Sequence, residues 1–367
     1  MWLKNITLLN FKNYTDANLS FSRTVNAFVG NNGAGKTNLL DAIHYLCLCK
    51  GYFNPVDSQQ IRTDTDLFLI QGDFERQEKN EKITCGVKRN QKKQFKRNKK
   101  EYDKLADHIG LFPLVMISPY DTNIIMEGSE ERRRFMDNVI SQTDPQYLDQ
   151  LITYNKHLLN RNALLKQITM TRSYDPALLE IYNEQLVSHG VRIFDKRKQF
   201  MLDFIPLFDQ YYKYLTNGSE TVGLQYQSQL NDAEFSRLLE QTFEKDKALE
   251  RTTSGVHKDD LIFTLSAMPL KKFGSQGQQK SFLIALKLAQ YAYLQKHKNF
   301  KPLLLLDDIF DKLDDARMRK LMEMVSHQDF GQIFITDTGR ARVMALFDSI
   351  HVPVTLFEVN NGTVNHA

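Results

Sequence analysis

Short apolar runs separated by polar turns dominate the first hundred residues, and this pattern predicts β-structure with one early helix. Apolar side chains recur through residues 3–11, and the run 25–29 (Val-Asn-Ala-Phe-Val) ends at a glycine. Apolar residues between Leu39 and Leu48 then follow at roughly helical spacing. The predicted order is therefore strand, glycine-bearing loop and helix. Further apolar runs at 68–74 and 83–87 predict β-hairpins between residues 67 and 98.

The pattern changes to helical spacing between residues 128 and 250. Asp144-Pro145 and Asp175-Pro176 each predict an N-cap followed by proline at the first helical position. An apolar stripe follows each pair, and both stripes are too short and irregular for a long coiled coil. We expect an all-helical insert over residues 119–250.

Strand-like runs return after the insert. Residues 261–265, Leu303–Leu306 and 332–336 are mainly apolar, and an amphipathic helix is expected between the first two. Strands that alternate with helices predict an α/β layer with a parallel sheet. We therefore predict an α/β fold whose head, residues 1–118 with 251–367, is split in sequence by the helical insert at 119–250.

The composition favours a folded chain without membrane spans. Of the 367 residues, 42% are hydrophobic and 25% are charged, which is ordinary for two or three globular domains. The three cysteines are too few for a disulfide framework, and no apolar run reaches the about 18 residues of a membrane span. These observations favour a cytoplasmic protein with no membrane attachment. The net charge of +4 neither requires nor excludes a nucleic-acid partner.

Residues 30–37 (Gly-Asn-Asn-Gly-Ala-Gly-Lys-Thr) match the P-loop pattern G-x-x-x-x-G-K-[ST] between a predicted strand and a predicted helix. Glycines let backbone N–H groups surround phosphates, and the helix N-terminus attracts the anion. In this pattern Lys36 reaches the β- and γ-phosphates of ATP, and the Thr37 hydroxyl is placed for Mg²⁺. An ordinary strand-to-helix turn with a solvated lysine is the alternative. The predicted ATP-binding residues are Gly30, Asn31, Asn32, Gly33, Ala34, Gly35, Lys36, Thr37 and Asn38.

An acidic residue at the end of a neighbouring strand completes the magnesium site of a P-loop enzyme. Asp307 and Asp308 follow the apolar run Leu303–Leu306 and fit this position. We predict that Asp307 binds Mg²⁺ through water, and that Asp308 lies near the γ-phosphate and orients the attacking water. A buried strand that ends in a helix-capping aspartate would give the same pattern. The expected catalytic residues are Lys36, Asp307 and Asp308, and the expected metal ligands are Thr37 and Asp307.

The loop at 274–278 (Gly-Ser-Gln-Gly-Gln) opens a predicted helix and resembles the signature motif of ABC-type ATPases. That motif is usually Ser-Gly-Gly-Gln, so Gln276 stands in place of its first glycine. In that class of protein the motif binds the γ-phosphate of the ATP held by the opposite subunit. A polar turn that caps an amphipathic helix is the alternative. The nucleotide-binding residues that the resemblance implies are Ser275, Gln276, Gly277 and Gln278.

Further sequence blocks resemble the RecF family of DNA-repair ATPases. They lie at residues 10–14 (Asn-Phe-Lys-Asn-Tyr), 128–137, 159–166, 255–260, 275–279 and 306–308, so the resemblance covers nearly the whole chain. It implies a head like that of SMC proteins with a second lobe, an ATP-driven homodimer, and binding to duplex DNA and single-strand/double-strand junctions. It also implies work with RecR and RecO in loading recombinase at gaps, in DNA repair, replication and the SOS response.

Several positions depart from the patterns of these ATPases. Asn54 stands where the RecF family commonly has arginine, and Val256 stands where proline is usual. Residues 336–338 (Thr-Asp-Thr) occupy the place of the histidine switch of ABC transporters, and no clear Q-loop glutamine follows residue 118. An arginine contact near residue 54, a histidine switch and a Q-loop are therefore not predicted.

Two basic clusters are candidate DNA surfaces. Residues 88–100 contain eight lysines and arginines, the kind of density needed to neutralise several DNA phosphates. A solvated hairpin tip is the alternative, because charge runs are usually solvated. Arg132, Arg133 and Arg134 begin the helical insert, where a solvated or ion-paired helix face competes with a DNA contact.

We predict an ATP-dependent DNA-binding protein of recombinational repair with weak, DNA-stimulated ATP hydrolysis. Hydrolysis is expected to be slow, because ABC enzymes usually carry Glu after the magnesium-binding Asp, and Asp308 is one methylene shorter. A transporter's nucleotide-binding subunit and a P-loop phosphotransferase are the alternatives. The long insert and the Ser-Gln-Gly-Gln form argue against the first, and the second leaves the loop at 274–278 unexplained.

Overall fold

The computed structural model describes residues 1–171, 173, 175–218, 220–310 and 315–366. The chain divides into two compact units, each of which has its own architecture. Unit 1 contains Met1–Asp121 and Lys280–Ala367, and unit 2 contains Thr122–Gln279. Residues 251–279, which the sequence pattern places in the head, pack within unit 2 instead.

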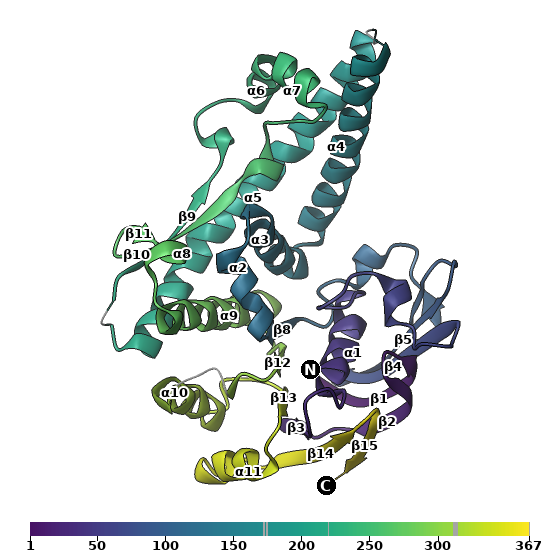
Figure 1. The fold of residues 1–367 in the computed structure, drawn as a ribbon, viewed down its shortest axis with the longest axis vertical. Helices are drawn as coiled ribbons and strands as arrows, with labels where there is room; N and C mark the ends of the chain where they lie inside the picture. The colour runs from purple at the N-terminus through teal and green to yellow at the C-terminus, as the bar shows by residue number, and fades with distance from the viewer. Residues whose placement is uncertain (172, 174, 219, 311–314, 367) are drawn as a thin grey trace. The chain divides into compact units, whose positions relative to one another are not determined.

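One sheet of unit 1 is antiparallel and comes from the first third of the chain (Figure 1). Its strand order is β2-β1-β4-β5-β6-β7, and its two long central strands pair over their whole length. The hairpins predicted between residues 67 and 98 are confirmed by β4, β5 and β6. The strands are β1 (Trp2–Phe11), β2 (Tyr14–Ser20), β4 (Leu67–Arg76), β5 (Lys79–Lys88), β6 (Gln94–Arg97) and β7 (Lys100–Glu101).

The second sheet of unit 1 is mostly parallel and combines segments from both ends of the chain. Its order is β15-β14-β3-β13-β12-β8, and every neighbouring pair except β14–β15 is parallel. Four of these strands are buried along their whole length, which explains their continuous apolar runs and confirms the predicted parallel sheet. The strands are β3 (Val25–Val29), β8 (Leu114–Ile117), β12 (Leu303–Leu306), β13 (Ile333–Asp337), β14 (Val354–Asn360) and β15 (Thr363–His366).

Helix α1 (Lys36–Leu48) packs against both sheets of unit 1. It contacts β1, β4 and β5 of the antiparallel sheet and β8 and β13 of the parallel sheet. Nearly all of its residues are buried, so the helix is enclosed around its circumference. Cys47 and Cys49 are buried free thiols. The other described helical segments that lie wholly in this unit are α10 (Asp315–Ser326), α11 (Arg340–Ser349), η1 (Asp57–Gln60) and η2 (Leu105–His108).

The parallel sheet brings the carboxyl ends of three strands to one edge. Strand β13 lies between β3 and β12, with Asp337 paired to Val29 and Ile335 paired to Leu306. The chain leaves β3 into the loop before α1 and leaves β12 into Asp307. Ligand sites of open α/β sheets lie at this edge. The topology thus places the P-loop and Asp307 side by side.

Unit 2 is mainly helical but contains a three-stranded antiparallel sheet of order β11-β10-β9. Strand β9 lies inside the segment 119–250, so the prediction of an all-helical insert is wrong at this point. The physical reason is that β9 is completed by pairing along its length with β10, a segment beyond the end of the predicted insert. The strands are β9 (Val222–Gln227), β10 (Asp260–Leu265) and β11 (Met268–Pro269).

Two long helices, α4 and α5, pack together in unit 2 (Figure 1). Both begin at the predicted prolines, and Asp144 and Asp175 accept hydrogen bonds from the backbone N–H groups of Tyr147 and Ala177, which confirms them as N-caps. Helix α5 continues through Pro206 well beyond its predicted apolar stripe. The helical segments are α2 (Asn123–Met126), α3 (Ser129–Thr143), α4 (Pro145–Thr171), α5 (Pro176–Thr216), η4 (Gln229–Asn231), α6 (Phe235–Gln241), α7 (Phe243–Leu249), η5 (Val256–Lys258) and α8 (Leu270–Phe273). Two segments belong to both units: η3 (Pro119–Thr122) and α9 (Gln276–Lys298).

Two fully buried arginines hold unit 2 together. Arg161 of α4 places its guanidinium 2.7 Å from the Asp246 carboxylate. Arg197 of α5 lies 2.7 Å from Asp259 and 2.8 Å from Asp137. Arg197 thereby joins two of the sequence blocks that resemble the RecF family, those at 128–137 and 255–260, while the block at 159–166 contributes Arg161 itself. In unit 2 these blocks therefore serve its internal packing.

Replacing Arg161 with alanine should destabilise unit 2 strongly. The substitution leaves the Asp246 carboxylate buried without its cation, which typically costs about 3–5 kcal/mol. Arg134→Ala is the control, because Arg134 pairs with Glu130 and Glu131 on the exposed face of α3 and should change stability by less than about 1 kcal/mol. Urea unfolding followed by circular dichroism measures both. Equal losses of unfolding free energy in the two variants would contradict the role given to Arg161.

Candidate nucleotide site

The loop between β3 and α1 has the backbone shape of a P-loop. Gly30, Gly33 and Gly35 all have positive φ angles, 154°, 81° and 116°. A Cβ atom at Gly30 would lie 2.2 Å from the carbonyl oxygen of Val359, so the close approach of β14 also requires glycine there. The glycines of the motif are thus set by backbone geometry.

Lys36 is the charged side chain of this loop, and it is buried. Its ammonium donates hydrogen bonds to the carbonyl oxygens of Gly30 (2.8 Å) and Asn31 (3.0 Å). The side chain therefore folds back over the loop, where its charge is balanced by the carbonyl dipoles. The solvated lysine of the alternative interpretation is wrong.

Two residues, one in strand β2 and one in the turn before it, support the loop. The Asn13 side chain donates to the Ala34 carbonyl (3.0 Å) and accepts from the Asn38 amide (2.7 Å). The Tyr14 hydroxyl donates to the Gly35 carbonyl at 2.9 Å, and burial raises the pKa of Tyr14, so it remains a donor. The sequence marks this pair only as part of the block at 10–14. No local pattern shows that the pair supports the loop, because the contacts join separate segments.

Asp307 lies where the motif predicts, beside the start of α1. The Thr37 hydroxyl donates to the Asp307 carboxylate at 2.9 Å. Burial raises the pKa of Asp307, while hydrogen bonds from Thr336 and Thr37 act in the opposite direction. Lys36, Thr37 and Asp307 therefore converge at the carboxyl edge of the parallel sheet.

The oxygen atoms of Thr37 and Asp307 fit a magnesium ion that is shared with nucleotide phosphates. Mg²⁺ prefers oxygen ligands and usually binds through one or two protein groups plus phosphates and water. Among the described residues, no group of three or more His, Cys, Asp or Glu side chains could hold a metal ion. This residue set thus fits a nucleotide-dependent metal site and offers no separate protein cage.

Asp308 has a strained backbone. Its φ angle is +45°, a region that side chains with a Cβ rarely adopt. Its backbone N–H donates to the Thr336 hydroxyl at 2.9 Å. Asp308 therefore follows Asp307 in a sharp turn, and it lies less buried than Asp307 at the same sheet edge.

The loop at 274–278 belongs to unit 2, and its local structure is a helix cap. The Ser275 hydroxyl accepts from the Gln278 N–H at 3.2 Å, while the Gln278 side chain accepts from the Ser275 N–H at 2.7 Å. This reciprocal pair is a capping box at the start of α9. The Gln278 amide also donates to Glu220 at 2.8 Å, and Gln276 is exposed. The capping geometry predicted as the alternative is present.

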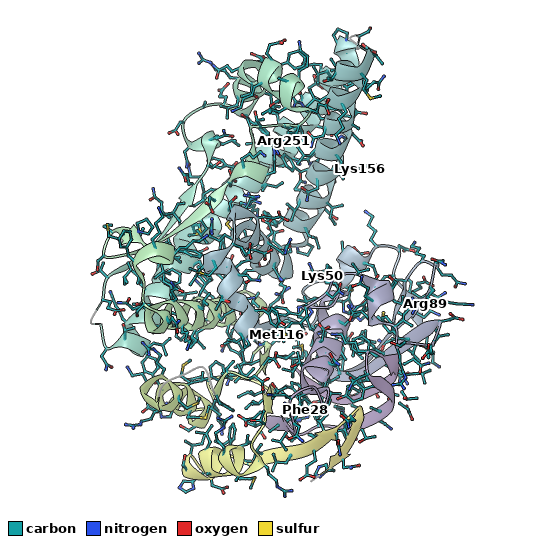
Figure 2. All side chains as sticks on the ribbon, in the orientation of Figure 1. Phe28, Lys50, Arg89, Met116, Lys156 and Arg251 are labelled. Carbon is teal, nitrogen blue, oxygen red and sulfur yellow. The ribbon has the colours of Figure 1, made fainter. Side chains whose placement is uncertain are left out.

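The two basic clusters differ in which of their cations pair with other groups of the protein. In the cluster at 88–100, Lys93 pairs with Asp57 at 2.9 Å and Arg97 pairs with Glu81, so these two cations stabilise the fold. Figure 2 shows Arg89 among the side chains that project from this hairpin. The exposed lysines of the cluster are Lys88, Lys92, Lys99 and Lys100.

Arg132, Arg133 and Arg134 are engaged within unit 2. Arg132 forms a two-point ion pair with Asp260 at 2.7 and 3.0 Å, and Arg133 donates to the Asp259 carbonyl at 2.6 Å. Arg134 pairs with acidic residues of its own helix. Arg132 and Arg134 are therefore ion-paired within unit 2, as one of the two interpretations of this cluster expects.

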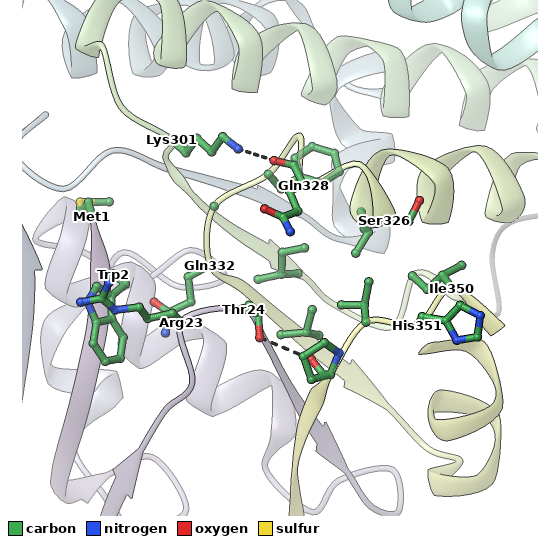
Figure 3. A pocket seen from close by; sticks show the side chains of 17 residues that line it. Met1, Trp2, Arg23, Thr24, Lys301, Ser326, Gln328, Gln332, Ile350 and His351 are labelled. Atoms are coloured by element: carbon green, nitrogen blue, oxygen red, sulfur yellow. Dashed lines mark hydrogen bonds between the residues drawn. The ribbon is translucent and has the colours of Figure 1, made fainter. Parts of the chain in front are cut away.

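A groove of about 480 Å³ lies at the edge of the parallel sheet opposite the P-loop (Figure 3). It is lined by the residues that enter β3, β13 and β14. Arg23 pairs with Glu75 at 2.5 Å, and the Lys301 ammonium donates to the Gln328 carbonyl. The groove thus lies apart from the nucleotide site, and these two cations already have partners.

None of the described helices is long and apolar enough to cross a membrane.

Comparison with known proteins gives a single family over the whole chain. The family model described as RecF/RecN/SMC N terminal domain matches residues 2–364. The DNA replication and repair protein RecF of Flavobacterium johnsoniae is 50% identical over 359 residues, covering 98% of this chain and 100% of the relative. The protein of the same name from Parabacteroides distasonis is 50% identical over 364 residues, covering 99% of each chain.

Solved structures give the same fold. A structure of the recombination mediator protein RecF with ATP in the RecFOR pathway is similar with a TM-score of 0.90 and 29% identity, covering 100% of this chain and 97% of that chain. The Smc head domain of Pyrococcus furiosus bound to the C-terminal domain of ScpA has a TM-score of 0.58 at 16% identity, covering 100% and 96%. The second likeness concerns the fold alone. The predicted ABC-type ATPase fold is confirmed.

Replacing Lys36 with methionine or arginine should abolish ATP binding without unfolding the chain. Methionine removes the charge, and the arginine fork does not reproduce the point charge that the loop encloses. A fluorescent ATP analogue measures binding, and thermal unfolding without nucleotide reports on folding. The exposed Lys92→Met is the matched control and should bind nucleotide as the unchanged protein does. If the Lys36 variants bind the ATP analogue with native affinity, Lys36 is not part of the ATP site.

Proposed function

The chain belongs to the family of RecF, RecN and SMC proteins, and on that premise we propose that it is a recombination-mediator ATPase of DNA replication and repair. Relatives that match it along its whole length are named RecF. The observation that carries the proposal is the convergence of Lys36, Thr37 and Asp307 in a chain that matches RecF from end to end. A transporter subunit and a phosphotransferase are not favoured, because the match includes the insert.

The residues of the proposed ATP site have distinct roles. Lys36 turns from the loop carbonyls to the β- and γ-phosphates, while the backbone N–H groups of residues 30–38 surround them. Thr37 and Asp307 hold Mg²⁺, which supplies positive charge at the phosphates when bound. Asp308 orients the attacking water. Its short side chain supports weak turnover, which suits a timed clamp better than a motor.

We further propose that ATP joins two copies of the chain. The N-terminus of α9, with Ser275, Gln276, Gly277 and Gln278, supports this proposal, because the positive end of a helix dipole attracts an anion. It would take the γ-phosphate of ATP held on the P-loop of the second copy. Hydrolysis then releases the dimer, so nucleotide sets the lifetime of the clamp.

The proposed partners are DNA and the other mediators of the pathway. A similar protein is described as acting in the RecFOR pathway, which supports RecR and RecO as partners of this chain. Duplex DNA and single-strand/double-strand junctions are the proposed nucleic-acid partners, bound through their phosphates. Buried free cysteines fit the reducing cytoplasm as the place of action.

Measuring ATP hydrolysis with and without duplex DNA tests the proposed function. Turnover should be slow alone and should rise with DNA, because DNA favours the ATP-bound dimer. A transporter subunit or a small-molecule phosphotransferase would show no such response. A rate that DNA leaves unchanged, at saturating ATP and low salt, would contradict the proposal.

The dimer should form with ATP and fail in Ser275→Arg. A bulky cation at the start of α9 blocks the approach of the partner's phosphate, while the P-loop of each copy still binds ATP. Light scattering with and without ATP gives the mass, and the fluorescent analogue gives the binding. Ser349→Arg, at an exposed serine of α11, is the control and should dimerise normally. If Ser275→Arg forms a dimer of native stability, the loop at 274–278 is not part of the dimer interface.

DNA affinity should depend on salt and not on sequence, with the exposed lysines of the hairpin neutralising phosphates. Replacing Lys88, Lys92, Lys99 and Lys100 with alanine should lower the log–log salt slope by about 0.9 for each phosphate that is no longer neutralised. Lys93→Ala is the control: it removes the pair with Asp57, so it should lower stability and leave the slope unchanged. An unchanged slope in the fourfold variant would identify the cluster as a solvated hairpin.

A further inference from the structure

Thr336 of strand β13 is fully buried and contacts both aspartates of the candidate site. Its hydroxyl oxygen lies 2.9 Å from Asp307 Oδ1, 2.9 Å from the Asp308 backbone nitrogen and 3.4 Å from Asp308 Oδ1. The pairing of β13 with β12 places it there, because Leu306, the last residue of β12, is opposite Ile335, and Asp307 and Thr336 are the residues that follow these two in the chain. The Thr336 hydroxyl therefore contacts both Asp307, proposed to hold Mg²⁺, and Asp308, proposed to orient the attacking water.

The direction of these hydrogen bonds follows from the atoms. The Asp308 N–H can only donate, so the Thr336 oxygen accepts from it. The single hydroxyl proton then goes to the Asp307 carboxylate, which is closer than that of Asp308. Because a hydroxyl that accepts a hydrogen bond becomes a better donor, the two bonds strengthen each other in this buried place.

Each bond fixes one feature of the site. Asp307 Oδ1 accepts from Thr37 as well as from Thr336, and two donors on one oxygen set the rotation of the carboxylate. At Asp308 the φ angle of +45° is unfavourable for a residue with a Cβ atom and persists only where its surroundings hold it. The bond from the Asp308 N–H to Thr336 is a contact that holds this turn.

We propose that Thr336 is a positioning residue for ATP hydrolysis. It orients the Asp307 carboxylate toward Thr37, and it holds the left-handed turn that aims Asp308. It makes no contact with the reacting atoms itself. The inference rests on the proposed function, because it assigns Thr336 to the same nucleotide site. A purely structural threonine would contribute to stability and leave the chemistry of folded protein unchanged.

Thr336→Val and Thr336→Ser form the test pair. Valine keeps the shape and removes the hydroxyl, while serine keeps the hydroxyl. Valine should lower kcat by about 10- to 100-fold, the usual effect of losing a residue that orients a metal ligand, with ATP binding in EDTA unchanged. Serine should restore kcat to within about threefold of the native rate, as expected if the hydroxyl is the active feature.

Hydrogen exchange supplies a second readout that is independent of activity. The amide of Asp308 should exchange faster in the valine variant, seen in the peptide spanning 303–310, and should be protected again in the serine variant. If the Thr336→Val variant does not fold, Thr336→Cys replaces it in every assay. Cysteine is close in size to threonine, and its thiol is only a weak hydrogen-bond donor. A native kcat in folded valine or cysteine protein, or unchanged exchange, would overturn the inference.

A double-mutant cycle separates action through Asp308 from a general loss of structure. If Thr336 works through Asp308, then Thr336→Val in an Asp308→Asn background should lower single-turnover hydrolysis much less than it does in the native background. Additive effects would contradict the inference for Asp308. If the native chain itself neither binds nor hydrolyses ATP, the proposed function fails, and that outcome is distinct from native hydrolysis that Thr336 does not affect.

Discussion

The hydrogen bond between Thr37 and Asp307 joins segments 270 residues apart and lies at the centre of the candidate nucleotide site. It forms because β3 and β12 flank β13 in one parallel sheet, so the chain leaves both strands at the same edge. The carboxylate lies deep in the protein, and burial raises the pKa of Asp307. Burying a carboxylate is costly even when hydroxyl groups donate to it, and the cost is offset when a cation binds.

The support of the P-loop comes from outside the motif. Asn13 and Tyr14 bond to the carbonyl oxygens of Ala34 and Gly35, and α1 is enclosed by two sheets. These contacts fix the backbone shape of the loop that the proposed ATP site uses. Preorganisation of this kind reduces the entropy lost on binding, which favours affinity without new contacts to the ligand.

Unit 2 contains buried ion pairs that join its helices. Its arginines at 161 and 197 are buried in ion pairs, where removing one partner is costly even though the pair itself adds little net stability. Such pairs fix the geometry of the helices that they join. The exposed capping box at the start of α9 is part of the same unit, so the rigid interior supports a surface loop whose shape is set by its own hydrogen bonds.

The sequence by itself determined the local features: the P-loop, the two Asp-Pro helix starts, the buried strands and the aspartates that follow one of them. Each depends on neighbouring residues, so a short pattern is enough. Tertiary structure alone decided that β9 is a strand, that Lys93 and Arg97 are paired within the fold, and that Asn13 and Thr336 support the site. These outcomes depend on partners from distant segments. The sequence of a charged or hydroxyl side chain is the same whether that side chain contacts solvent or a buried carboxylate.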